Sequence, residues 1–177
     1  MNTVLIQGIG FAGVLFFILS YQIKSNKTLF LFQLLGSAMF CCQFLLMDAY
    51  SGIVNLIAII ARNILLIKTR DWKWVQSKWL ESVFLIFFTI CLYASWQGPV
   101  SLLPYMAMAV TTVAYWTDNP LIIRLGNLIC GSPCWLIYDA IIGSWAGIIN
   151  ESITIGSILI SIWRFGWKEM GRSDSDF

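Results

Sequence analysis

The sequence predicts an all-α membrane protein, a seven-transmembrane-helix bundle in which two parallel three-helix repeats are joined by a linker helix. Three observations lead to this fold class: an apolar composition, regularly spaced polar breaks, and an internal repeat. Of the 177 residues, 59% are hydrophobic and 11% are charged, against about 45–50% and 25% in ordinary soluble domains. The mean hydropathy is +0.79. A soluble chain of this length could not bury so much apolar surface, whereas a bilayer accepts it.

Apolar runs of close to twenty residues alternate with short polar or glycine-bearing breaks. A helix rises about 1.5 Å per residue, so about twenty residues cross the ~30 Å hydrocarbon core of a bilayer. Charged or proline-bearing turns at this spacing favour seven helices over fewer, longer and more tilted ones. The spans are predicted near residues 4–21, 28–47, 51–67, 79–96, 99–117, 121–140 and 144–165.

The basic residues predict the orientation of the chain. Ten of the eleven lysines and arginines lie in or beside alternate breaks, and the N-terminal tail and the other breaks carry none. Basic loops stay in the cytoplasm, so the N-terminus is expected outside and the C-terminus inside. The eleventh, Arg62, falls within the third span. The ten one-sided residues are Lys24, Lys27, Lys68, Arg70, Lys73, Lys78, Arg124, Arg164, Lys168 and Arg172.

An internal repeat appears when the chain is aligned with itself at an offset of 95 residues. Gly36-Ser37 then falls on Gly131-Ser132, Gly52-Ile53 on Gly147-Ile148, and Asn55 on Asn150. The matches keep one offset and involve small and polar residues, which are scarce in this chain. Two three-helix units joined directly would have opposite orientations in the membrane. One additional helix between them gives both units the same orientation, so the repeats are predicted to be parallel.

This repeat divides the chain into four parts. Residues 1–68 form the first three-helix repeat, 69–98 a cytoplasmic loop and the linker helix, 99–167 the second repeat, and 168–177 a cytoplasmic tail. In carriers with parallel repeats, SWEETs among them, the substrate site lies near the bilayer midplane between the repeats.

The chain resembles the YgjV family of bacterial inner-membrane proteins. The resemblance rests on length, on Ser20-Tyr21-Gln22 and Ser25-Asn26-Lys27, and on a tryptophan-rich second half. More distantly, the whole chain is similar to the SWEET, PQ-loop and PnuC group of carriers with three, one and three helices. These resemblances imply a multi-pass protein of the cytoplasmic membrane that moves a small solute. No Pro-Gln dipeptide of the PQ-loop type occurs in the chain.

Asn55 and Asn150 are the predicted substrate-binding residues. The resemblance to SWEETs implies that an asparagine on the third helix of each repeat faces the solute. Each amide can offer two donors and an acceptor to a neutral solute. The alternative is that both asparagines join helices to one another, a common role for asparagine in membranes. The two interpretations carry about equal weight at this point.

Glu151 and Arg62 are the charged residues that fall well inside predicted spans, away from their ends, and they are expected to line the cavity or to couple transport to protons. A charged side chain at the bilayer centre costs about 2.5–3.5 kcal/mol on the insertion scale, so such residues usually mark a functional path. Arg62 could instead extend its guanidinium toward the cytoplasmic surface. Cavity lining or proton coupling is favoured for Glu151 over structural pairing.

Pro104, Pro133, Gly36 and Gly131 are the predicted hinge residues. Proline removes a backbone hydrogen bond and bends a helix, and the resemblance to SWEETs implies proline hinges. Trp135, two residues after Pro133, lies well inside the sixth span, where it could stack on a ring-bearing solute or simply fill space.

The sequence carries no recognisable catalytic or metal-binding pattern. There is no histidine, no Walker A motif and no nucleophile elbow. The five cysteines lie in apolar runs and are expected to be small apolar filler. We therefore expect no enzyme activity, no cofactor and no metal. The expected partners are the lipid bilayer and a small solute, without nucleic acid. The favoured function is a facilitator or proton-linked carrier; the alternative is a non-transporting receptor or assembly partner.

Overall fold

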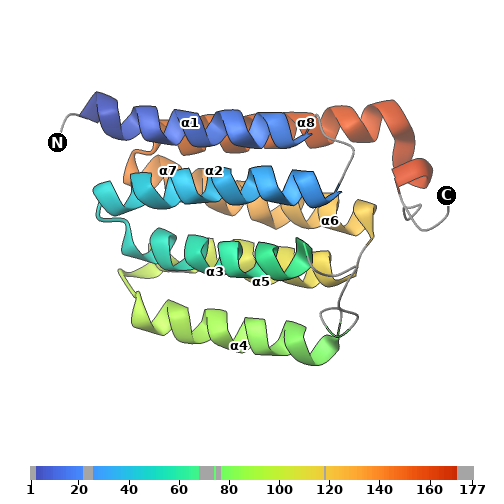
Figure 1. The fold of residues 1–177 in the computed structure, drawn as a ribbon, viewed down its shortest axis with the longest axis horizontal. Coiled ribbons are helices and arrows are strands. Elements are labelled where there is room, and N and C mark those ends of the chain that lie inside the picture. The colour runs from blue at the N-terminus through green and yellow to red at the C-terminus, as the bar shows by residue number, and fades with distance from the viewer. Residues whose placement is uncertain (1–2, 22–25, 68–73, 75–76, 118, 171–177) are drawn as a thin grey trace.

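The computed structural model describes residues 3–21, 26–67, 74, 77–117 and 119–170, and these residues form helices joined by short turns. Figure 1 shows the helices lying side by side along one direction, with successive helices running in opposite senses. The helices are α1 (Thr3–Tyr21), α2 (Asn26–Leu46), α3 (Tyr50–Ile67), α4 (Lys78–Ala94), α5 (Leu102–Trp116), α6 (Pro120–Gly126), α7 (Ser132–Ile142) and α8 (Trp145–Met170).

Two short segments complete the helices of the second half. The 3₁₀ turn η2 (Pro99–Ser101) leads directly into α5, and the π-helical segment η3 (Asn127–Gly131) joins α6 to α7 in one continuous rod. The described residues therefore form seven rods, and the predicted all-α fold with seven helices is confirmed. The last helix differs from its predicted span, because α8 continues to Met170 rather than ending near residue 165.

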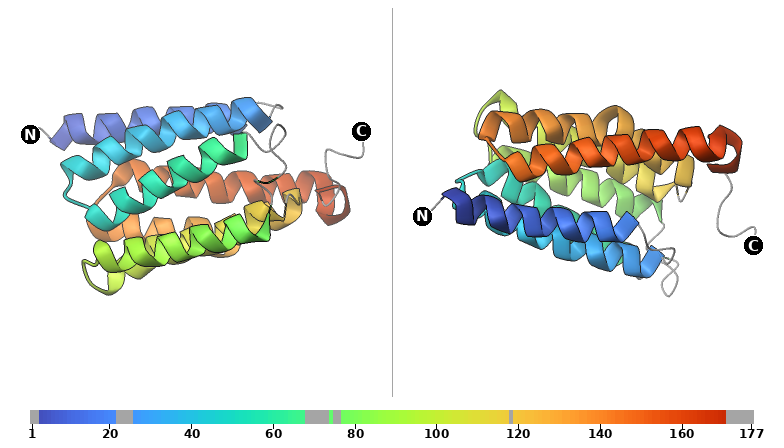
Figure 2. Two further views of the ribbon diagram at one scale, coloured as in Figure 1. Left: turned by 60° about the horizontal axis from the view of Figure 1, so that its bottom comes forward. Right: turned by 90° about the horizontal axis from the view of Figure 1, so that it is seen from above.

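The chain packs as two triplets of helices. In the first triplet (α1, α2 and α3), the middle helix packs against both others, and in the second triplet (α5, the α6–η3–α7 rod, and α8) the middle rod does the same. The triplets meet where α1 packs on α8 and α3 packs on α5. Figure 2 shows the first triplet, blue to teal, beside the second, yellow to red. In Figure 1, equivalent helices of the triplets run in the same direction.

The turns between the second and third helix of each triplet are built alike. Asp48 and Gly143, which are 95 residues apart, both adopt a left-handed backbone, with φ of 55° and 76°. The next residue then donates back to the last turn of the preceding helix, from Ala49 N to Phe44 O at 3.0 Å and from Ser144 N to Asp139 O at 2.8 Å. Glycine suits this conformation and aspartate tolerates it.

Each of these turns also accepts a hydrogen bond from a glutamine outside its own triplet, Gln7 in α1 or Gln97 in the segment between α4 and η2. The Gln7 side-chain amide donates to the carbonyl of Gly143 at 3.1 Å, and the Gln97 amide donates to the carbonyl of Asp48 at 3.2 Å. The two contacts close the same end of the bundle, the end at which the N-terminus lies in Figure 1.

Helix α4 lies outside both triplets, packed against α3 and α5. Phe84 and Phe88 form a buried cluster with Met108 and Trp116 of α5. The opposite face of α4 exposes large apolar side chains, with Ile86, Ile90 and Tyr93 at least 61% exposed. An apolar surface of this extent is typical of a helix that faces another apolar medium.

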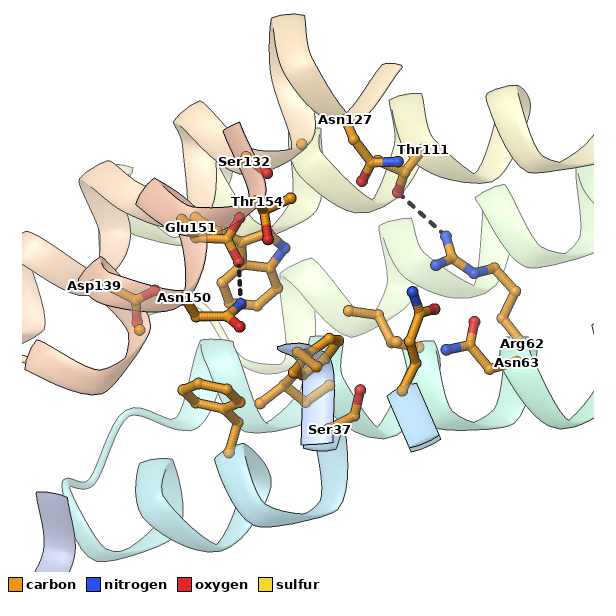
Figure 3. A pocket seen from close by; sticks show the side chains of 18 of the residues that line it. Ser37, Arg62, Asn63, Thr111, Asn127, Ser132, Asp139, Asn150, Glu151 and Thr154 are labelled. Carbon is orange, nitrogen blue, oxygen red and sulfur yellow. Dashed lines mark hydrogen bonds between the residues drawn. The ribbon is translucent and has the colours of Figure 1, made fainter. Parts of the chain in front are cut away.

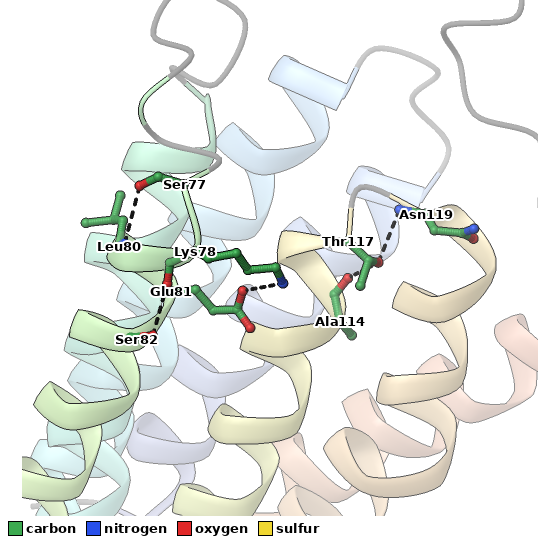
Figure 4. Close-up of polar contacts among 8 residues, drawn as sticks. All are labelled: Ser77, Lys78, Leu80, Glu81, Ser82, Ala114, Thr117 and Asn119. Carbon is green, nitrogen blue, oxygen red and sulfur yellow. Dashed lines mark hydrogen bonds and ion pairs between the residues drawn. The ribbon is translucent and has the colours of Figure 1, made fainter.

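Polar caps define where α4 and α6 begin, at the opposite end of the bundle (Figure 4). The Ser77 hydroxyl accepts from Leu80 N at 3.4 Å, and Lys78 pairs with Glu81 at 2.7 Å. The Asn119 side chain accepts from Leu121 N at 2.9 Å, and Pro120 occupies the first helical position. Proline is favoured there because that N–H has no partner within the helix. These caps explain why both helices start close to their predicted positions.

Candidate functional site

A cavity of about 110 Å³ lies between the two triplets. A water molecule needs roughly 10–15 Å³ of such space, so the cavity has room for several waters or a small solute. Both triplets line it, and Figure 3 shows the polar side chains directed toward it from several helices. The polar lining residues are Gln33, Ser37, Arg62, Asn63, Thr111, Tyr115, Asn127, Ser132, Asp139, Asn150, Glu151 and Thr154.

Equivalent positions of the two triplets meet at this cavity. Five pairs of lining residues are separated by the 95-residue offset of the sequence repeat. The first-triplet members bring one hydroxyl and four apolar side chains, whereas the second-triplet members bring an indole, two hydroxyls and two carboxylates. The pairs are Ser37 with Ser132, Phe40 with Trp135, Phe44 with Asp139, Leu56 with Glu151, and Ile59 with Thr154.

The acidic part of the cavity is formed by α7 and α8. The Asn150 amide donates to the Glu151 carboxylate at 3.0 Å, and Ser132 lies within hydrogen-bonding reach of the same carboxylate. Asp139 is 3% exposed, and its Oδ1 has no hydrogen-bond partner in the described structure. Asp139 and Glu151 are close enough to interact electrostatically. Two acids in one cavity can share a proton more easily than they can both remain ionised.

Gly147 creates the space in which the Asp139 carboxylate lies. A Cβ at position 147 would fall 2.2–2.4 Å from the Asp139 carboxylate atoms. The equivalent Gly52 makes the same space for Phe44, since a Cβ there would fall 2.6 Å from the ring. The sequence match between Gly52 and Gly147 therefore reflects a shared close contact between the second and third helices.

The basic part of the cavity contains Arg62 of α3. Its guanidinium Nη1 donates to the hydroxyls of Thr111 at 3.2 Å and Thr112 at 3.0 Å. The guanidinium carbon lies 4.5 Å from the centre of the Tyr115 ring, a cation–π contact. Arg62 is 3% exposed, and among the described residues no carboxylate pairs with it. Arg62 thus reaches α5 and the cavity, and does not extend to the surface.

The structure brings most of the predicted site residues together. Arg62, Trp135, Asn150 and Glu151 all line the cavity, as does Gly131. Trp135 packs against Phe44 and Tyr138, with ring centres 6.2 and 5.7 Å apart. Its ring therefore makes a tilted contact with Phe44 and an edge-on contact with Tyr138.

Asn55 does not share the position expected from the repeat. It is 1% exposed and does not line the cavity; its amide donates to the carbonyl of Ser51, one turn back, at 2.8 Å. The expectation that both asparagines face one cavity is therefore wrong for Asn55. The reason lies in the neighbouring packing: Tyr138 reaches across from α7 and binds the Ser51 hydroxyl at 3.0 Å and Gly52 N at 2.9 Å.

The two prolines occupy different structural positions. Pro104 lies in the first turn of α5, where its missing N–H breaks no helical hydrogen bond. Pro133 lies in the second position of α7, directly after the π-helical segment Asn127–Gly131. A π segment just before a proline relieves the clash between its ring and the preceding turn. The local irregularity expected of a hinge is thus present at Pro133 and absent at Pro104.

The two predicted hinge glycines allow close helix contacts. A Cβ at Gly36 would fall 2.7 Å from the Phe17 ring of α1, and one at Gly131 would fall 2.8 Å from the Thr111 methyl of α5. In each triplet, the middle helix therefore approaches the first helix through a glycine at the equivalent position. Whether either glycine also bends during function stays a prediction.

Sequence reasoning did not select several residues that shape the site. Asp139 falls at the end of the predicted span 121–140, beside a break, and was not selected, yet it lies in α7 and lines the cavity. Thr111, Thr112, Tyr115 and Asn127 lie beside Arg62 or the π segment. The offset of 95 residues would have pointed to Asp139, because it matches Phe44 inside a helix, but an acid beside an apparent turn resembles a loop residue.

The residues that the structure describes contain no group of three acidic, cysteine or histidine side chains suited to a metal ion. The sulfurs of Cys130 and Cys134 lie 3.8 Å apart on one helix face, and the two thiols do not form a disulfide bond.

These features define a class: an all-α protein with an apolar outer surface and a polar cavity between two helix triplets. Within the described residues, one helix, Leu121–Ile142, is long and apolar enough to cross a membrane by length and composition, and the apolar stretches Thr3–Leu19, Leu31–Leu46, Tyr50–Leu66 and Trp145–Ile160 are shorter. The chain belongs to the Imp-YgjV family, described as bacterial inner membrane protein, whose model matches residues 4–169. No curated protein and no solved structure matches the chain.

Proposed function

We propose that this inner-membrane protein moves a small solute across the membrane through its central cavity, by facilitated or proton-linked transport and without enzymatic chemistry. The observation that carries the proposal is the polar cavity between the triplets, lined by equivalent positions of both. Buried polar groups are costly in a membrane, and a cavity lined by many of them is typical of a substrate path.

The proposed architecture is a multi-pass bundle of two parallel repeats related by a pseudo-two-fold axis along the membrane normal. The repeated turns at Asp48 and Gly143, the reciprocal contacts of Gln7 and Gln97, and the shared direction of equivalent helices support it. The axis would run through the cavity. A two-fold arrangement of this kind gives a carrier two similar halves that can rock against each other around a central site.

The proposed orientation has the N-terminus outside and the C-terminus in the cytoplasm. Helix positions support it, since Lys27 in α2, Lys78 in α4 and Arg124 in α6 all lie at the same end of the bundle. A phosphatase active only in the periplasm should be inactive when fused after Phe177, whereas a cytoplasmic fluorescent reporter there should be bright. The reverse pattern would contradict the orientation.

Within this proposal, Asn150 and Trp135 bind the solute, and Glu151 with Asp139 holds the coupled proton. The π segment before Pro133 is the element that changes shape, because its backbone hydrogen bonds differ from those of the flanking helices.

A second candidate is a non-transporting receptor or assembly partner on the same fold. It is favoured by the difference between the middle helices: α2 is regular from Asn26 to Leu46, whereas its counterpart contains η3. A carrier with two rocking halves would use a flexible element in each.

Uptake into proteoliposomes separates the two candidates. Vesicles holding the purified full chain would be tested with a panel of radiolabelled vitamins, nucleosides, sugars and small carboxylates, with and without an inward proton gradient. We expect uptake of at least one solute, accelerated by the gradient. Glu151→Gln should abolish the acceleration, whereas Glu81→Gln, a matched change on α4 away from the cavity, should retain it. Binding without uptake would favour the receptor.

A further inference from the structure

We propose that the cavity binds a small organic monocarboxylate, whose carboxylate group pairs with the Arg62 guanidinium. This inference rests on the proposed function and names the substrate class for the same cavity. It begins from one observation: a fully charged side chain is buried at the cavity wall without an acidic partner.

Arg62 has the properties of an anion-binding residue. A guanidinium remains protonated under all ordinary conditions. Here it is 3% exposed and lines the cavity, and its Nε has no hydrogen-bond partner in the described structure. A buried charge without a counter-ion is strongly unfavourable. An anion entering the cavity would remove that cost, and the guanidinium fork is shaped to receive two carboxylate oxygens.

The neighbours of Arg62 hold it in place without neutralising it. Thr111 donates its own hydroxyl proton to the carbonyl of Ala107 at 2.7 Å, which leaves its lone pairs for Arg62. Thr112 accepts a second hydrogen bond, and the Tyr115 ring contacts one face of the guanidinium. These groups are all uncharged. They orient the guanidinium while its full positive charge remains available to a ligand.

The carboxylates of the cavity lie too far along the bundle to serve as the missing partner. Glu151 is equivalent to Leu56, and Arg62 lies six residues beyond Leu56 on α3. At 1.5 Å per residue this separation is about 9 Å of rise. Figure 3 likewise shows Arg62 and Glu151 on different sides of the cavity. The space between them is where the body of a solute would lie.

The charges of the side chains that line the cavity favour a ligand with a single negative charge. Arg62 is the one arginine or lysine among the lining residues, and Asp139 and Glu151 line the same cavity. A dianion such as phosphate would face one positive charge and two acids, whereas a monocarboxylate matches the single guanidinium. The remaining lining groups near Arg62 are neutral amides, Asn63 and Asn127, which suit a small polar body.

Binding to the purified full-length protein tests the inference without requiring transport. Thermal unfolding in detergent, at constant pH and ionic strength, would be followed with acetate, lactate and benzoate. Each is compared with its neutral amide and with inorganic phosphate. A ligand that binds only the folded state raises the melting temperature in proportion to the logarithm of its concentration. At least one carboxylate should raise the melting temperature, and its amide and phosphate should not.

Two variants assign the effect to Arg62. Arg62→Lys keeps the charge and loses the fork, so it should weaken carboxylate binding at least tenfold. Arg62→Gln should abolish it. If Arg62→Gln does not fold, two measurements still test the inference. They are the carboxylate affinity of Arg62→Lys and the difference in melting temperature that an acid and its amide produce in the wild-type protein. Four results would each overturn the inference. They are equal stabilisation by the acid and its amide, stabilisation by phosphate alone, no response to any carboxylate, and unchanged carboxylate affinity in Arg62→Lys.

The same ligands in the uptake assay separate this inference from the proposed function. Carboxylate binding without uptake would contradict transport and support the anion site. Uptake of neutral solutes that carboxylates do not inhibit would support transport and contradict the anion site.

Discussion

The two helix triplets have the same backbone plan and give the cavity two different walls. At equivalent positions the first triplet places Phe44, Leu56 and Ile59, and the second places Asp139, Glu151 and Thr154. Both triplets have a left-handed residue in the turn between the second and third helices, and both have glycines at equivalent helix crossings.

The comparison shows that helix packing and cavity chemistry are controlled by different positions. Glycines such as Gly36 and Gly131 decide how closely the backbones approach, because any side chain there would collide with the neighbouring helix. Residues that point into the cavity have space on one side, so a phenyl ring and a carboxylate can occupy equivalent places. In the proposed carrier, these positions of the first triplet would contact the apolar part of a solute, those of the second triplet would hold the proton, and Arg62 of α3 would receive the solute's charge.

The largest expected effect comes from giving the second wall the chemistry of the first. Glu151→Leu copies Leu56, and it should abolish the acceleration of uptake by the proton gradient, because the carboxylate proposed to hold the coupled proton is lost. The melting temperature should stay the same or rise, since removing a carboxylate from an apolar bundle removes a desolvation cost. Leu56→Met, a volume-conserving change on the first wall, is the control and should retain uptake. Full acceleration of uptake in Glu151→Leu would show that the difference between the walls has no functional role.

A smaller effect is expected from filling the glycine spaces that the triplets share. Gly52→Ala and Gly147→Ala should each destabilise the fold by about 1–3 kcal/mol, the usual cost of overpacking. Gly8→Ala is the matched control, because a Cβ there meets nothing within 4 Å. It should be neutral or stabilising by about 0.5–1 kcal/mol. Reversible unfolding in mixed micelles measures all three, and a stable Gly147→Ala would argue against equivalent packing.

The two asparagines test the difference between the triplets directly. Asn55→Ala should cost about 1 kcal/mol of stability, because a buried hydrogen bond from its amide to the Ser51 carbonyl is lost, and it should keep ligand binding. Asn150→Ala should lose binding and change stability little, because its side chain faces the cavity. Measuring melting temperature and binding on the same purified variants gives both values. Similar behaviour of the two variants would contradict their different placement.

The smallest effect is expected in α4, which belongs to neither triplet. The Lys78 side chain is 76% exposed and pairs with Glu81 three residues on. Lys78→Ala should change the free energy of unfolding by about 0.5–1 kcal/mol, because Lys78 is exposed while its partner Glu81 is largely buried, and it should leave uptake unchanged. A loss of uptake in this variant would extend the functional region to the linker helix.

The sequence by itself determined the helices. Composition and polar spacing predicted seven rods, and the family relationship followed from residues visible in the chain. It also predicted four side chains at the cavity: Arg62, Trp135, Asn150 and Glu151. The helix predictions succeed because a helix in an apolar medium must satisfy its own backbone, so hydropathy and turn residues locate it without reference to neighbours.

Only the tertiary structure decided which polar side chains reach the cavity and which are buried away from it. Asn55 and Asn150 are equivalent in sequence, yet the hydroxyl of Tyr138 occupies the turn before Asn55, and Asn150 instead meets Glu151. Asp139 resembles a loop residue in sequence and becomes a cavity acid because Gly147 of the next helix leaves room for it. Such placements depend on side chains from other helices, which the local sequence around each residue does not contain.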